Sequence, residues 1–251
     1  MNRMLVLGTE IDRISFSEAI ELALNSMEHR RGDYLVTPNT EIVLRADRSP
    51  ELREAIRGAA LSLPDSIGVE IACRILGTPI AERIPGIDFA SALFGRMADR
   101  RQSVFLLGAE DGVAARAAAA LLARFPGIGI AGTENGYFDR SIEEDIVGRI
   151  NSASPDLLLV CLGSPKQELW MHRNAPRLRV GLMAGLGGAL DVFSGDVPRA
   201  PESWRKIGFE WLYRLLREPK RAKRAVKLPL IVFEAIRKRI KGEREIWQRG
   251  S

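Results

Sequence analysis

Residues 155–170 have the sequence PDLLLVCLGSPKQELW, and this stretch decides the fold class. Its first half contains a continuous apolar run, residues 157–162, which predicts a strand buried on both faces. Gly163 ends the run, and a Ser-Pro turn then leads into a predicted helix. Lys166 and Gln167 would lie in the first turn of that helix, beside its partly positive N-terminus. Since ligands of α/β sheets bind where strands end, this corner is suited to an anionic ligand.

The alternation of strand, small-residue turn and helix extends over most of the chain. Strands are predicted at residues 33–36, 60–63, 103–107, 128–132, 157–162 and 180–184. Helices are predicted at residues 15–27, 41–46, 51–58, 69–76, 89–100 and 141–153, with another ending at residue 125. Strands that alternate with helices predict an α/β fold with a doubly wound, mostly parallel sheet.

Polar and glycine clusters follow these strands, so they should converge at one edge of the sheet. They lie at residues 37–40, 65–68, 108–112, 135–137, 163–167 and 185–191. Asp65 would place a carboxylate at the same edge as Thr37 and Asn39, but all three residues could instead act only as helix caps.

The remaining clusters suggest how a nucleotide could bind. The turn after Gly108 is similar to a nucleotide-binding corner, although it lacks a full G-x-G-x-x-G. Tyr137 follows a turn and could stack on a base. Glycines at strand ends let a ligand approach the backbone. These clusters contribute the substrate-binding candidates Gly108, Asn135, Gly136, Tyr137, Gly163, Lys166, Gly185, Gly187 and Asp191.

Charge is distributed unevenly over the 251 residues. From Arg199 onward there are 16 Lys and Arg against 6 Asp and Glu, whereas residues 1–198 have a net negative charge. The predicted tail helices at 203–216 and 230–240 place Trp and Leu on one face and Lys and Arg on the other. They could lie on a membrane surface, dock on the body or pack on a neighbouring subunit.

Other features exclude several classes of protein. No stretch is long and apolar enough to span a bilayer, and the N-terminal segment lacks the features of a signal peptide. Cys73 and Cys161 lie in apolar surroundings, as expected of buried free thiols in a reducing compartment. With only two Cys and two His, far apart, a zinc site is not expected.

Taken together, the motifs resemble the bacterial WecG/TagA/CpsF family of glycosyltransferases. The matching segments keep the family's order over nearly the whole chain. They are VTPNTEIV, LPDSIGVEIACRILGTPIAERIPGIDF, FLLGAEDGVA, GTENGYF, PDLLLVCLGSPKQELW and GLGGALDVFSGDVPRAPESWRKIGFEWLYRLLREPKR. One position departs from the family pattern, because Ser66 stands where a glycine is common.

The resemblance implies a Rossmann-like catalytic domain at residues 1–198 and a basic, membrane-associating appendage at 199–251. It implies an inverting enzyme at the cytoplasmic membrane face that acts in cell-surface polysaccharide biosynthesis. The donor would be a UDP-sugar of N-acetylmannosamine, its uronic acid or glucose, and the acceptor a polyprenyl-diphosphate-linked sugar. No metal or other cofactor would be needed, and the sequence contains no Asp-x-Asp motif.

The resemblance also implies roles for individual residues. Asp65 matches the general base, which would deprotonate the acceptor hydroxyl. Its active-site companions would be Thr37, Asn39, Arg83 and Gln167. Helix N-termini after Gly108, Gly163 and Gly187, with Arg83 or Lys166, would stabilise the leaving UDP. Arg214, Arg221 and Arg224 match tail positions that would meet the lipid diphosphate.

Two other classes of function compete with this interpretation. A nicotinamide-dependent oxidoreductase would use the same sheet edge, but it needs a fuller glycine fingerprint and an acidic residue after the second strand. A nucleic-acid-binding module would fit the sequence pI of about 9.5. However, the excess basic charge is confined to a tail rich in Trp and Leu, so nucleic acid is not expected as a partner.

Overall fold

The computed structural model describes residues 2–30, 32–201, 204, 227–241 and 248–249. Arg214, Arg221 and Arg224 lie outside the described residues, as does nearly all of the predicted helix at 203–216. The division of the chain at residue 198 stays a prediction.

The main sheet has six strands, all parallel, in the order β4-β3-β8-β7-β5-β6. These strands are β3 (Asp33–Val36), β4 (Leu61–Ser62), β5 (Ser103–Gly108), β6 (Gly129–Glu134), β7 (Leu157–Cys161) and β8 (Leu182–Gly185). The predicted α/β class and parallel sheet are therefore confirmed. The apolar run of β7 forms a central strand in which every residue is buried, as expected for a strand covered on both faces.

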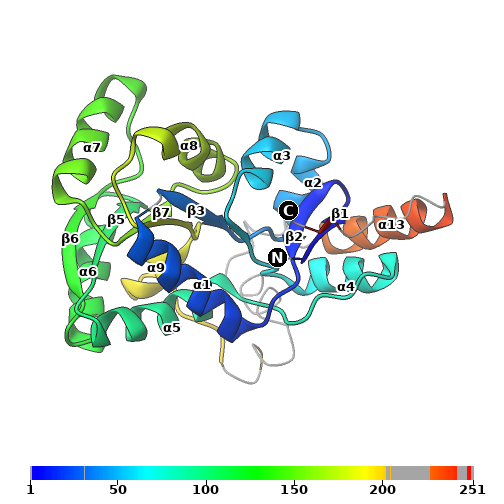
Figure 1. The fold of residues 1–251 in the computed structure, drawn as a ribbon, viewed down its shortest axis with the longest axis horizontal. Helices are drawn as coiled ribbons and strands as arrows, with labels where there is room; N and C mark the ends of the chain where they lie inside the picture. The colour runs from blue at the N-terminus through cyan, green and yellow to red at the C-terminus, as the bar shows by residue number, and fades with distance from the viewer. Residues whose placement is uncertain (1, 31, 202–203, 205–226, 242–247, 250–251) are drawn as a thin grey trace.

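Helices cover both faces of this sheet (Figure 1). One face packs against α1 (Phe16–His29), α5 (Gly86–Asp99), α6 (Val113–Arg124) and α9 (Ala189–Phe193). The other packs against α2 (Thr40–Ala46), α3 (Pro50–Arg57), α7 (Arg140–Ala153) and α8 (Lys166–Asn174), which the short 3₁₀ helix η1 (Ala175–Arg177) follows. This arrangement leaves the carboxyl ends of the strands along one edge, between the two helical layers.

A small antiparallel sheet lies beyond β4, and the sequence analysis did not predict it. It consists of β1 (Asn2–Val6), β2 (Thr9–Asp12) and β9 (Gln248–Arg249). The turn between β1 and β2 is Leu7-Gly8, and both residues have positive φ, as two-residue hairpin turns of type I′ require.

The hairpin belongs to a third hydrophobic cluster, which also includes α4 (Ile67–Leu76) and α13 (Lys227–Ile240). Met4 and Val6 from β1 share this cluster with Ile231 and Ala235 from α13. In Figure 1 the hairpin and α13 lie at the same end of the molecule, next to α4. The described part of the basic tail is thus a helix docked on the body, in agreement with one of the interpretations left open.

Candidate functional site

The strand order places the predicted site residues along one edge of the sheet. From one side to the other, the strand ends lead to Asp65, Thr37, Gly185, Gly163 and Gly108, and Asn135 follows β6. The outer strands β4 and β6 are five strand spacings apart, or about 24 Å. The edge is therefore long enough to hold an extended ligand.

Asp65 does not cap the helix that follows it. Ser66 is the N-cap of α4, and its side chain accepts a hydrogen bond from the N–H of Val69. The Oδ1 atom of Asp65 instead accepts a 2.8 Å hydrogen bond from the N–H of Gly86, the first residue of α5. The carboxylate thus lies at the partly positive end of another helix.

Thr37 lies close to Gly86, the residue that binds this carboxylate, and does not act as a helix cap. Its hydroxyl donates a 3.1 Å hydrogen bond to the carbonyl of Gly185 on the neighbouring strand β8. A methyl group added at Gly86 would lie 3.7 Å from the Thr37 hydroxyl oxygen, so Thr37 and Gly86 are close neighbours. Asn39 does act as a cap, since its Oδ1 accepts from the N–H groups of Glu41 and Ile42.

Gln167 reaches the same part of the edge from α8. Its side chain is buried, with Nε2 donating a 2.8 Å hydrogen bond to Oε1 of Glu168. Its Oε1 has no hydrogen-bond partner among the described residues, and it would lie 3.7 Å from a methyl group added at Gly187. A buried acceptor without a partner costs free energy, so this oxygen is a candidate acceptor for a donor group of a ligand.

Glu168 is itself fully buried, and the sequence analysis missed it. Burial raises the pKa of its carboxyl above the usual glutamate value of 4.5, and the hydrogen bond from Gln167 opposes that shift. The periodicity of α8 contained a signal for this residue. Glu168 is three positions before the buried Met171, and that spacing places both on one helical face.

Lys166 joins a second group of residues on the other side of α8. Its Nζ donates a 2.9 Å hydrogen bond to the carbonyl of Gly136 and lies 4.6 Å from the ring centroid of Phe138. In the same loop Asn135 accepts a hydrogen bond from the N–H of Tyr137, whose side chain is 77% exposed. An exposed aromatic ring can stack on a base, and a lysine ammonium group attracts a negatively charged group.

The candidate glycines differ in what surrounds them. At Gly108 an added methyl group would lie 2.3 Å from the Cys161 carbonyl oxygen, and at Gly185 it would lie 2.6 Å from Met171. These glycines, like Gly136, allow close packing within the protein. Gly163 has φ of 75° and no atom within 4 Å of such a methyl group, and Gly187 also leaves space. The open part of the edge therefore lies between β7 and β8.

The two remaining candidates come from the loop before α5 and from α9. Arg83 precedes Ile84, whose N–H donates a hydrogen bond to the carbonyl of Pro64. The Nε atom of Arg83 lies 3.9 Å from the Glu70 carboxylate. Asp191 lies in the first turn of α9. Burial raises the pKa of the Cys161 thiol to about 12, and the negative charge of Asp191 adds to that shift. Arg83 adds positive charge near Asp65.

Several helices begin at this edge without a side-chain cap. The starts of α5, α6 and α8 have no side-chain N-cap hydrogen bond, whereas α2 and α4 are capped by Asn39 and Ser66. The N–H groups of α5 are partly satisfied by Asp65. The starts of α6 and α8 can bind an anion, because the first N–H groups of a helix have no partner within it.

Comparison with known proteins agrees with this geometry. Residues 4–245 match the glycosyl transferase WecG/TagA/CpsF family. The chain belongs to this family. It is therefore a glycosyltransferase, as the sequence motifs predicted, and the oxidoreductase alternative is not favoured.

Two relatives share the name N-acetylglucosaminyldiphosphoundecaprenol N-acetyl-beta-D-mannosaminyltransferase. The protein from Bacillus spizizenii is 34% identical over 211 residues, which cover 84% of this chain and 81% of the relative. The protein from Staphylococcus aureus strain MW2 is 34% identical over 231 residues, covering 91% and 90%.

The structure also explains Ser66, the departure from the pattern of this glycosyltransferase family. Its Oγ accepts a 3.1 Å hydrogen bond from the N–H of Thr40 and lies 3.1 Å from the Thr40 hydroxyl. The side chain therefore joins the starts of α4 and α2.

No cluster of three or more His, Cys, Asp or Glu side chains among the described residues is arranged to hold a metal ion. Within the same residues, no helix combines the length and the apolar character needed to cross a bilayer.

Proposed function

We propose that this glycosyltransferase moves N-acetylmannosamine from UDP-N-acetylmannosamine to N-acetylglucosaminyl-diphospho-undecaprenol, with inversion at the anomeric carbon. The observation that carries the proposal is the position of Asp65, held by Gly86 at the start of α5 beside Thr37. The names of the relatives support the choice of sugar and acceptor.

Inversion needs a single displacement, and Asp65 has the chemistry for its proton transfer. The acceptor hydroxyl attacks the anomeric carbon, a new C–O bond forms, and the bond from that carbon to the UDP oxygen breaks. The Asp65 carboxylate takes the hydroxyl proton. Help from a general base is typically worth about 10²–10⁴-fold in rate. Thr37 and Gln167 both lie beside Gly185 at the end of β8, and they would position the sugar.

The donor would lie across the sheet edge with its base toward Tyr137. In this orientation the diphosphate would meet the starts of α6 and α8, with Lys166 nearby and Arg83 on the sugar side. These positive groups would stabilise the charge that develops on UDP as it leaves, without a metal ion. The unpartnered Oε1 of Gln167 would accept from a hydroxyl or the acetamido N–H of the sugar.

A transfer assay tests this assignment. The full-length protein is incubated with a short-chain polyprenyl-diphosphate N-acetylglucosamine and, separately, with UDP-N-acetylmannosamine, its uronic acid form and UDP-glucose. Mass spectrometry of the lipid product should show one added N-acetylhexosamine only with the first donor. A product with UDP-glucose alone would exclude the proposed sugar, and no product with any donor would exclude the proposed reaction.

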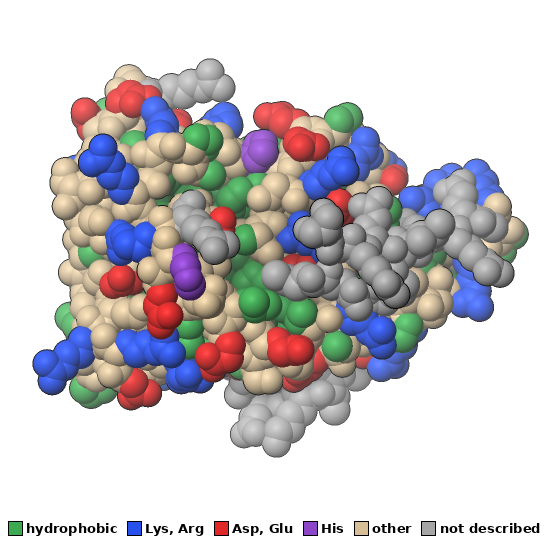
Figure 2. Space-filling view, viewed as in Figure 1, with side chains coloured by type: hydrophobic (Ala, Val, Ile, Leu, Met, Phe, Trp, Pro, Cys, Tyr) green, Lys and Arg blue, Asp and Glu red, His purple; other side chains and the backbone are tan. Residues whose placement is uncertain are grey.

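The enzyme is further proposed to act at the inner face of the plasma membrane, on which its lipid-linked acceptor would lie. The support comes from α13, which buries Ile231 and Ala235 against the body. An apolar stripe remains exposed on the helix, formed by Leu230, Phe233, Ile236 and Ile240. Arg237, Lys238 and Arg239 occupy its last turn, and Figure 2 shows Lys and Arg side chains at that end of the molecule. Such a combination of apolar and basic groups suits an anionic membrane surface.

A vesicle sedimentation assay separates this role from self-association. Phe233, which is 62% exposed, is replaced by Asp. The matched control is Leu122→Asp, since Leu122 on α6 is also an exposed apolar residue, at 49%. Phe233→Asp should reduce binding to anionic vesicles, and Leu122→Asp should not. If Phe233→Asp changes the oligomeric state and leaves vesicle binding unaltered, the stripe is an interface between two copies of the chain.

A further inference from the structure

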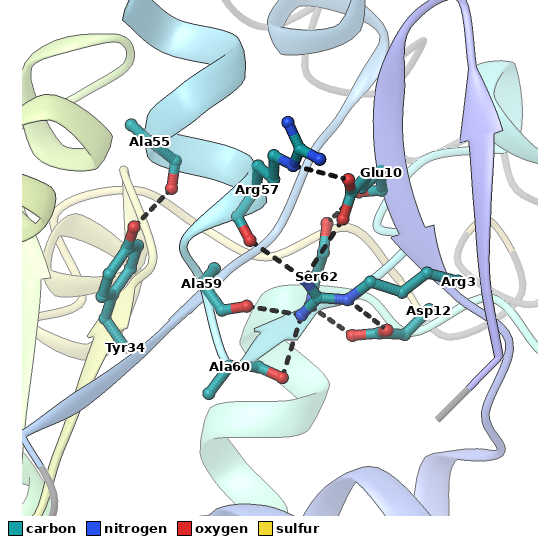
Figure 3. A network of polar contacts seen from close by, with 9 residues as sticks. All are labelled: Arg3, Glu10, Asp12, Tyr34, Ala55, Arg57, Ala59, Ala60 and Ser62. Carbon is teal, nitrogen blue, oxygen red and sulfur yellow. Dashed lines mark hydrogen bonds and ion pairs between the residues drawn. The ribbon is translucent and has the colours of Figure 1, made fainter. Parts of the chain in front are cut away.

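The N-terminal hairpin is fastened to β4 by a network of polar contacts around Arg3 (Figure 3). The Arg3 guanidinium donates a 2.9 Å hydrogen bond to Oδ1 of Asp12 and contacts Glu10 at 3.3 Å. On the side of the body, it donates to three backbone carbonyls, those of Arg57, Ala59 and Ala60. One side chain thus joins both strands of the hairpin to the segment that enters β4.

Asp12 completes the connection to β4 itself. Its side chain is fully buried, and its Oδ2 accepts a 2.7 Å hydrogen bond from the N–H of Ser62. The Ser62 hydroxyl donates in turn to the carbonyl of Glu10 at 2.5 Å. Because β4 is the edge strand of the main sheet, the Ser62 N–H has no further strand to pair with, and Asp12 satisfies it.

This attachment matters for the site because β4 has only two residues and ends three positions before Asp65. The intervening Leu63 and Pro64 are buried, and proline fixes its own φ near −65°. Leu63 donates to the Val36 carbonyl, and Pro64 accepts from the N–H of Ile84. Only two residues, Leu63 and Pro64, separate Ser62 from Asp65, and both are buried and held by backbone hydrogen bonds. A shift of Ser62 would therefore move the Asp65 carboxylate.

We infer that Arg3, Asp12 and Ser62, here called the hairpin clamp, are positioning residues that hold the proposed base Asp65 in its reactive position. The inference rests on the proposed function, since it requires Asp65 to act as the base. None of the three residues touches the reacting atoms. Their effect is on the rate of the proton transfer, where a displacement of about 1 Å can cost on the order of 10²-fold.

A double-mutant cycle tests the clamp. Arg3→Met in the full-length enzyme should lower kcat at least about tenfold and leave the KM for the UDP-sugar and the Kd for UDP unchanged. In an Asp65→Asn background, Arg3→Met should have no further effect on the residual rate, because the group that it positions is absent. A role in general stability would instead lower both rates by the same factor, and that result would overturn the inference.

Two further variants keep the test decisive if Arg3→Met folds poorly. In Asp12→Asn the amide oxygen can still accept from Arg3, but the NH₂ group then faces the Ser62 N–H, and two donors cannot form a hydrogen bond. This variant should therefore lower kcat. Arg3→Lys keeps the charge without the guanidinium's reach to several carbonyls, so its kcat should be intermediate. Arg96→Met is the matched control, since it removes an ion pair with Glu21 between α5 and α1.

The outcomes separate this inference from the proposed function. An inactive Asp65→Asn enzyme combined with a wild-type kcat for Arg3→Met and Asp12→Asn would overturn the clamp alone. A fully active Asp65→Asn enzyme would overturn both the base and the clamp that serves it. A loss of kcat shared with Arg96→Met, at equal folded fraction by circular dichroism, would also contradict the clamp.

Discussion

The N–H of Gly86 donates a 2.8 Å hydrogen bond to Oδ1 of Asp65, so the start of α5 holds a carboxylate that belongs to the end of β4. The two residues are 21 positions apart in the chain. This contact orients one oxygen of the carboxylate at the end of α5 that lies close to Thr37. Asp65 thereby supplies an acceptor that Pro85, the N-cap residue of α5, cannot provide.

Replacement of Asp65 by Asn should separate proton transfer from binding. Asn keeps an acceptor for Gly86 but takes up no proton, so kcat should fall by about 10²–10⁴-fold. The Kd for UDP, measured by calorimetry, should stay near the wild-type value. Asp99→Asn at the exposed far end of α5 is the control and should keep full activity. A wild-type kcat for Asp65→Asn would show that another group accepts the proton.

Gly187→Ala should reveal the space that a ligand uses. The new methyl group fits the protein, with Oε1 of Gln167 3.7 Å away, but it would occupy the opening between β7 and β8. We expect the KM for the UDP-sugar to rise about tenfold, a change of about 1.4 kcal/mol, with an unchanged melting temperature. Gly148→Ala on the exposed face of α7 is the control. An unaltered KM would place the sugar elsewhere.

Glu168 gives a prediction that depends on pH. Burial raises the pKa of its carboxyl in the folded state, so the folded protein holds the proton more tightly than the unfolded chain. Stability should therefore fall as the pH rises above the usual value of 4.5. Glu168→Gln should raise the melting temperature at neutral pH, and the difference should vanish below that value. A constant difference at every pH would mean that the carboxyl is not responsible.

Two substitutions of Glu168 test whether its carboxyl also orients the side-chain amide of Gln167. Glu168→Gln still offers an acceptor to Nε2 of Gln167, so kcat/KM should stay within about twofold of the wild type. Glu168→Leu removes that acceptor and lets the Gln167 amide turn, which should lower kcat/KM about tenfold. Equal activity of the two variants would show that Glu168 does not orient Gln167.

Chelation tests the proposed role of the helix starts and Lys166 in stabilising the leaving UDP. Dialysis of the enzyme against EDTA should leave the transfer rate unchanged. Lys166→Met should lower kcat, since it removes a positive charge beside α8. Loss of activity in EDTA that Mg²⁺ or Mn²⁺ restores would contradict metal-independent transfer.

Local patterns were sufficient to predict the main sheet and its ligand edge. The six predicted strands form within two residues of their expected bounds. The clearest local signals were the apolar runs of β5 and β7, which are buried and end at or just before a glycine. The hydrogen bond between Asp65 and the N–H of Gly86 could not be predicted from local patterns, because the two residues are far apart in the chain. The sequence analysis considered Asp65 as a possible cap of the helix that follows it, and the folded chain shows that Ser66 is that cap.

The hairpin and its contacts were missed for a related reason. Its two strands are short, and the positive φ of Leu7 is unusual for a residue with a branched side chain. Arg3 and Asp12 have the appearance of surface charges in the sequence. Their partners lie 7 to 57 positions away, so the pairing depends mainly on the fold and not on local spacing.

The third hydrophobic cluster has a consequence for biosynthesis. Met4 and Val6 leave the ribosome well before Ile231 and Ala235, which help to cover them and emerge more than 220 residues later. Contacts this distant in sequence form late and slowly. During translation the hairpin must therefore wait for α13, and the stripe that we propose for the membrane becomes correctly presented only when that helix docks.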